Sequence, residues 1–171
     1  MIDPSIRGQI VERQTTFLRF QTSDGTEYKV TYIGKKEFRI KDLCFRGISV
    51  VEMHPLLEYY QFQHVDVFIS SRPAAPLNVV NEIEMMVKSF SCGWRSSAEF
   101  FNPQRKAGIL LDEGFGLLFS GPINMANKVT DILQLADVTY SIVSHRAVEQ
   151  QSVKALIFGR NAIVASDFLI S

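Results

Sequence analysis

The sequence predicts an α+β protein with a mostly antiparallel sheet, because the spacing of its hydrophobic residues changes along the chain. Through much of the first 54 residues, apolar and polar side chains alternate, as in strands with one buried face. After residue 64 the spacing changes from every second residue to every third or fourth, and then back. The hydrophobic fraction is 46%, which is enough to form a core and excludes general disorder.

The first 54 residues predict an N-terminal β-meander. Two β-rich runs, 16–21 and 28–33, flank Ser23-Asp24-Gly25-Thr26, and Asp-Gly between such runs favours a tight hairpin turn. Residues 36–41 alternate in the same way. Because a meander of this size is marginally stable alone, we expect it to pack on the sheet of the following residues or to extend it.

From residue 64 onward the pattern predicts the order β-α-β-β-α-β, followed by a hairpin. The expected elements are a strand at 65–69, a helix from Leu77, a hairpin at 108–119, a helix at 125–136, a strand at 138–143 and a last hairpin at 155–165. This is the ferredoxin-like order, in which two helices lie on one face of an antiparallel sheet. We therefore expect two parts, 1–54 and 64–171, with the last hairpin in the second.

Charge and cysteine content restrict the class of protein. The 18 basic and 18 acidic residues cancel, which argues against a protein dedicated to duplex DNA. Cys44 and Cys92 are too few for a disulfide framework. No signal peptide or membrane-spanning run is visible, so we expect a cytoplasmic location and no membrane partner. The mean hydropathy of +0.06 is high for a soluble monomer, which favours an oligomer.

The glycine-rich stretch 114–121 lacks the residues of a phosphate loop. It runs from an expected strand towards an expected helix, as such loops do. However, Phe119 takes the place of the third small residue of a dinucleotide fingerprint, and Pro122-Ile123 replaces the lysine and hydroxyl of a P-loop. Histidines and cysteines also lack the spacing of metal ligands. We expect no cofactor and no metal.

An enzyme remains the main alternative because of His64-Val65-Asp66. Residues two apart on a strand share a face, so the imidazole and the carboxylate could form a base with its orienting partner. Arg95 would then hold an anionic substrate of a small hydrolase or transferase. This hypothesis predicts that His64, Asp66 and Arg95 converge in one concave pocket. A solvated polar face at the start of a buried strand is the simpler interpretation.

Two further features suggest binding surfaces. Trp94 continues the apolar stripe of the first helix, and Arg95 either pairs with Glu99 or stands at the rim of a pocket. The second feature is a basic segment with interleaved aromatic residues, a mixture that binds single-stranded nucleic acid. Simple alternation, with aromatic residues inward and basic ones outward, explains it equally. The segment spans residues 28–47, and its basic residues are Lys29, Lys35, Lys36, Arg39, Lys41 and Arg46.

No complete catalytic motif is present, which favours a non-enzymatic cytosolic protein that binds another protein or itself. The candidate binding residues are Lys35, Lys36, Arg39, Lys41, Trp94 and Arg95. Nine basic and six acidic residues precede residue 51, so the first part is weakly positive and the rest weakly negative, and this difference would steer association. Binding of single-stranded nucleic acid is a third hypothesis. The expected fold does not decide among them, since many unrelated functions share it.

Overall fold

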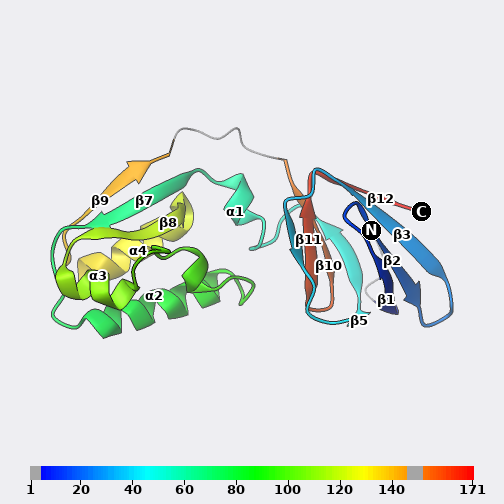
Figure 1. Cartoon of the computed structure of the whole chain (residues 1–171), viewed down its shortest axis with the longest axis horizontal. Coiled ribbons are helices and arrows are strands. Elements are labelled where there is room, and N and C mark those ends of the chain that lie inside the picture. Colours follow the sequence, from blue (N-terminus) through cyan, green and yellow to red (C-terminus); the bar gives the residue numbers. More distant parts are fainter. Residues whose placement is uncertain (1–4, 146–151) are drawn as a thin grey trace. The chain divides into compact units, whose positions relative to one another are not determined.

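The computed structural model describes residues 5–145 and 152–171 (Figure 1). The chain divides into two compact units. One contains residues 1–57 together with 151–171, and the other contains residues 58–150. We call them the β unit and the α+β unit. None of the described helices is long and apolar enough to cross a membrane.

The β unit consists of two antiparallel sheets, with strand orders β12-β3-β2-β1-β5 and β4-β11-β10-β6. The predicted hairpin at Asp24-Gly25 is present, because Phe17–Thr22 pairs with Glu27–Ile33 and Gly25 takes a positive φ of 89°. The strands are β1 (Arg7–Arg13), β2 (Phe17–Thr22), β3 (Glu27–Ile33), β4 (Glu37–Arg39), β5 (Cys44–Arg46), β6 (Ile48–Val51), β10 (Lys154–Phe158), β11 (Asn161–Ala165) and β12 (Asp167–Ile170).

The C-terminal strands belong to the β unit. Strand β10 pairs with β6, β11 pairs with β4, and β12 pairs with β3. This differs from the expected grouping of the last hairpin with residues 64–171. Every residue of β11 is buried, so the hairpin needs covering on both faces and pairing on both sides. The apolar sequence of the hairpin predicts that it is buried, but it does not predict which strands pair with it.

The core of the β unit is built from both sheets. Phe45 packs edge-on against Phe20 and Phe158, with ring centroids 5.4 and 5.3 Å away. Residues that are far apart in the sequence therefore share one core. Its buried members are Leu18, Phe20, Val30, Tyr32, Phe45, Ile48, Leu156, Phe158, Ile163 and Ala165.

A buried asparagine fixes the C-terminal hairpin to the loop before β5. The Oδ1 atom of Asn161 accepts hydrogen bonds from the backbone N–H groups of Lys41 and Asp42, at 2.7 and 2.9 Å. Its Nδ2 atom donates to the carbonyl oxygen of Asp42 at 2.9 Å. The exposed Arg160 side chain binds the Asp42 carboxylate, and these hydrogen bonds lower the pKa of Asp42.

The α+β unit contains a three-stranded antiparallel sheet with the order β8-β7-β9. The two helices expected from the spacing are confirmed, and they are α2 and α4. Pro76 occupies the first turn of α2, where its missing N–H costs nothing. The elements are α1 (Glu58–Gln61), β7 (His64–Ile69), α2 (Pro76–Phe90), the 3₁₀ turn η1 (Ser97–Glu99), α3 (Ala107–Glu113), β8 (Gly116–Pro122), α4 (Ile123–Leu135) and β9 (Tyr140–Ser144).

The ferredoxin-like order is not confirmed, because one of its expected strands is helical. Residues 108–111 lie in α3, which buries Ala107, Leu110 and Leu111. Gly114 ends this helix with a positive φ of 79°, and an added Cβ there would lie 2.8 Å from the backbone nitrogen of Arg72. A short apolar run does not distinguish a strand from a buried helix, and Gly114 caps a helix rather than forming a hairpin turn.

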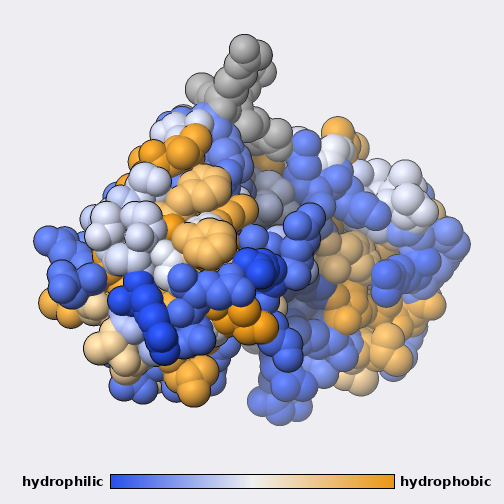
Figure 2. All heavy atoms as spheres, turned by 60° about the vertical axis from the view of Figure 1, so that its left-hand side comes forward, coloured by the Kyte–Doolittle hydropathy of each residue, from blue (hydrophilic) through white to orange (hydrophobic). Residues whose placement is uncertain are grey.

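The core of the α+β unit joins the sheet to its helices. The inward residues of β7, which are Val65, Val67 and Ile69, belong to one buried cluster with residues of α2 and α4. The helical members include Val79, Ile83, Val87, Val129 and Leu133. Outside this core, hydrophobic side chains are exposed in several separate areas among hydrophilic ones, as Figure 2 shows for one side of the unit.

Candidate functional site

Strand β7 presents a polar face opposite its apolar one. His64, Asp66 and Phe68 alternate with the buried valines and isoleucine, and all three are half-buried. The period of two thus places His64 and Asp66 on the same face, as the sequence predicts. The adjoining strands add Ser120 and Val143 on either side of Asp66.

The side chain of Asp66 contacts His145 rather than His64. The Nε2 atom of His145 lies 2.9 Å from Oδ1 of Asp66. His64 instead has its Nε2 atom 2.7 Å from the carbonyl oxygen of Tyr59. The two imidazole rings have centroids 6.4 Å apart. The cluster therefore joins β7 to the end of β9 by a side-chain bridge.

The order of these groups does not suit acyl-transfer chemistry. In a nucleophilic triad the histidine stands between the nucleophile and the carboxylate. Here Asp66 lies between Ser120 of β8 on one side and β9, the strand that leads to His145, on the other. The middle position is therefore held by a carboxylate and not by a histidine. Among the described residues, no group of three or more His, Cys, Asp and Glu side chains could hold a metal ion.

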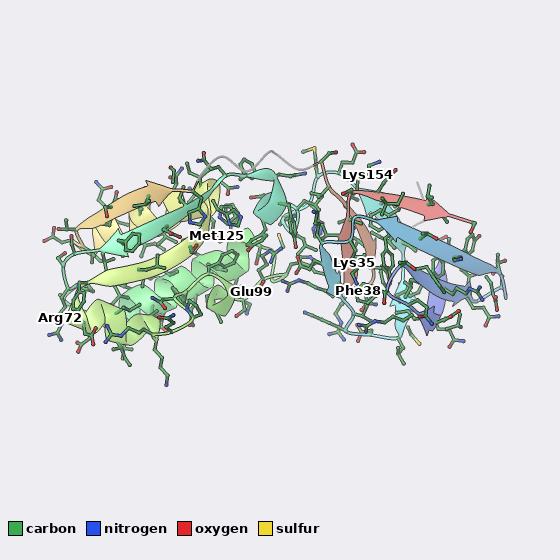
Figure 3. The ribbon with its side chains drawn as sticks, turned by 45° about the horizontal axis from the view of Figure 1, so that its top comes forward. Lys35, Phe38, Arg72, Glu99, Met125 and Lys154 are labelled. Carbon is green, nitrogen blue, oxygen red and sulfur yellow. The ribbon has the colours of Figure 1, made fainter. Side chains whose placement is uncertain are left out.

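Arg95 lies against Tyr59 and is buried. Its Cζ atom is 4.3 Å from the centroid of the Tyr59 ring, and that ring contacts the His64 ring at 4.5 Å. Its Nη1 atom is 2.9 Å from Oε2 of Glu99, which Figure 3 labels, so the expected pair four residues apart is present. Arg95 is thus connected to His64 through an aromatic ring and points its charge at Glu99. The neighbouring Trp94 is half-buried.

Two surface grooves lie elsewhere. One, of about 490 Å³, runs between α2 and residues 98–108 and is lined by Val80, Phe101 and Ala107 among others. The second, of about 410 Å³, lies on the β unit beside Arg7 and Cys44. Neither groove is lined by His64, Asp66 or Arg95, the residues on which the enzyme hypothesis depends.

The basic residues named from the sequence lie on the β unit. Lys35, Lys36 and Lys41 are exposed, whereas Arg39 is half-buried and paired with Glu37. The ammonium group of Lys35 is 5.8 Å from the centroid of the Phe38 ring, and the two are seen together in Figure 3. Because Trp94 and Arg95 belong to the α+β unit, the six candidate binding residues divide between the two units.

The two edges of the α+β sheet differ. The outer edge of β8 is covered by residues 100–102. Phe101 forms a bridge with Phe119, and the N–H of Ser120 donates to the carbonyl oxygen of Phe100 at 2.8 Å. In addition, Asn102 Nδ2 donates to the carbonyl oxygen of Leu117 at 3.2 Å. The chain therefore protects this edge from pairing with another strand.

The outer edge of β9 has no such cover within the described residues. The N–H of His145 bonds to His64, and the carbonyl oxygen of Thr139 accepts from Ser70, so odd-numbered residues direct their backbone groups to β7. The even-numbered residues consequently direct theirs outward. These are Tyr140, Ile142 and Ser144, and together they present three N–H donors and three carbonyl acceptors.

The side chains of β9 do not discourage pairing. Its sequence is Tyr-Ser-Ile-Val-Ser, without charge or proline, and Ile142 and Val143 are 42% and 51% exposed. Natural proteins usually protect edge strands with lysine, proline or a bulge. The spacing predicts a strand here but does not show that it is an edge. The one sequence feature that is consistent with an open edge is the lack of charged residues in this strand. That feature can be interpreted only when the strand order of the sheet is known.

No protein-family model matches this chain, and neither a curated protein nor a solved structure matches it.

Proposed function

We propose that this chain is a non-enzymatic protein-interaction module that binds an extended protein segment along β9. The observation that carries the proposal is the asymmetry of the two sheet edges: the chain covers β8 with its own backbone and leaves β9 uncovered among the described residues. Unpaired strand edges are templates for the addition of another strand.

Binding would use the backbone for affinity and the side chains for selection. The outward groups of Tyr140, Ile142 and Ser144 would form the hydrogen bonds of an added strand. We infer that α2 and α4 both cover the face of the sheet that carries Val65, Val67 and Ile69. Ile142 would then select hydrophobic residues near the helices, and Val143 would select them on the opposite face.

The alternative functions have weaker support. The side chains of His64, Asp66 and His145 hold each other or backbone groups, which is the pattern of a structural polar face. Tyr32 is buried and Phe38 is half-buried, so they offer little stacking surface to nucleotide bases.

A selection experiment tests the proposal. A library of displayed random peptides would be selected separately on the full chain and on the Ile142→Pro variant. Proline at 142 removes an outward N–H but no hydrogen bond to β7, so the sheet should persist. We expect the wild type to enrich peptides that alternate β-branched residues, and recovery on the variant to fall about tenfold.

Leu135→Ser serves as the matched control, because Leu135 is an 87% exposed hydrophobic residue at the end of α4 and outside β9. This variant should recover peptides as the wild type does. Thermal unfolding of both variants would verify that they are folded. Equal recovery on wild type and Ile142→Pro would refute binding along β9.

A further inference from the structure

We propose that the segment which pairs with β9 is β9 of a second copy of this chain, antiparallel to the first and centred on Ile142. The inference rests on the proposed function and names its partner. It would join two three-stranded sheets into one continuous six-stranded sheet and so remove the open edge.

The outward backbone groups of β9 are self-complementary. They belong to Tyr140, Ile142 and Ser144, a set that is symmetric about its middle residue. In an antiparallel pair centred there, Ile142 exchanges two hydrogen bonds with Ile142 of the second copy, and Tyr140 exchanges two with Ser144 at each end. Six bonds form, and no outward group of the strand remains unpaired.

The side chains also suit this register. Ile142 meets Ile142 on the face nearer the helices, and Ser141 meets Val143 on the opposite face. No like charges are brought together, since the strand carries none. The whole chain has zero net charge, so two copies do not repel each other at long range.

The expected association is reversible. A contact made by one short strand from each copy is small, and protein interfaces below about 1,200 Å² are weak. Monomer and dimer should therefore exchange as the protein concentration changes. Association should also depend on the outward backbone groups of β9 and should not depend on the exposed side chains of α2.

Cysteine cross-linking tests the register. Both native cysteines are exposed and free, so Cys44 and Cys92 are first changed to serine. Chains carrying Ser141→Cys are then mixed with chains carrying Val143→Cys, and oxidised glutathione accepts the two electrons of the disulfide. Directly opposed residues of a pair without mutual hydrogen bonds have Cα atoms about 4.5 Å apart, within the range for a disulfide.

We expect the mixture to cross-link at least about tenfold faster than either variant alone, since neither variant opposes two cysteines in this register. Cross-linking of Ser141→Cys chains with each other would overturn the inference, because it requires Ser141 to lie opposite Ser141 of the second copy, and the register centred on Ile142 does not allow that. As a second test, Ile142→Lys places two ammonium groups opposite each other and should abolish the dimer, whereas Ile142→Thr should retain most of it.

These experiments distinguish pairing with a second copy from the proposed function, which is the binding of an extended protein segment along β9. A wild-type chain that sediments as a monomer at high concentration and does not cross-link refutes the second copy. If the peptide selection still depends on the Ile142 N–H, the interaction module stands and its partner is a different protein. If that selection also fails, both proposals are wrong.

Discussion

Removal of residues 152–171 is expected to unfold the β unit and to leave the α+β unit folded. The deletion takes away β10 and β11, which are the two central strands of their sheet, so β4 and β6 lose their only partners within that sheet. It also removes the three largest of the fully buried side chains that this segment contributes to the core, which are Leu156, Phe158 and Ile163. Each contributes about 1.5–3 kcal/mol, and their sum approaches the whole stability of a typical domain.

The measurement is the amide spectrum of the shortened chain by NMR. Signals of residues 5–57 should collapse to the positions of an unfolded chain, while those of residues 58–145 should remain dispersed. A chain that lacks only residues 167–171 is the control, because among the described strands β12 lies at the edge of its sheet and pairs with β3. Dispersed signals from residues 5–57 without the C-terminal strands would contradict the discontinuous β unit.

Asn161→Leu is expected to destabilise the β unit by about 2–4 kcal/mol. Leucine has the same number of side-chain heavy atoms, branched at Cγ in the same way, but it cannot accept the hydrogen bonds from Lys41 and Asp42 or donate to the Asp42 carbonyl oxygen. A buried polar group left without a partner costs about 1–3 kcal/mol. The effect should be large although Asn161 lies about 120 residues from Lys41 and Asp42 in the sequence, because the C-terminal hairpin and the loop before β5 are in contact in the folded β unit.

Urea unfolding followed at the β unit measures the free-energy change. Arg160→Ala is the matched control: it removes the adjacent side-chain bond to Asp42, but both groups of that pair are on the surface, where solvent screens them. We expect this control to change the unfolding midpoint little. Similar losses in the two variants would mean that the buried amide does not hold the hairpin.

The long elements were predictable because their own residues carry the signal. The stripe of Val80, Ile83 and Val87 predicts a helix whatever it packs against. In α2 the buried residues are Val79, Ile83 and Val87, so the buried face includes Val79 in place of Val80. The helix α3 was not predictable, since residues 108–111 are too few to show a period. The C-terminal hairpin was found, but its partners were not, because strand pairing depends on the topology of the whole chain.

The candidate site was predictable to a smaller extent. Period two was enough to place His64 and Asp66 on one face. The bridge from Asp66 to His145 depends on the register between β7 and β9, which spacing along one strand does not contain. The open edge of β9 is likewise a property of the strand order. The sequence therefore predicted the strands of this sheet, but it did not predict that β9 lies at the edge on which the proposed function depends.

The most direct test of pairing at β9 is amide hydrogen exchange at two adjacent residues over a range of protein concentrations. The N–H of Val143 points to Asp66 of β7, whereas the N–H of Ile142 points outward. We predict that Val143 is protected at every concentration and that protection of Ile142 rises as the chain becomes more concentrated. Rapid exchange at Ile142 throughout that range would contradict the pairing of β9 with a second copy.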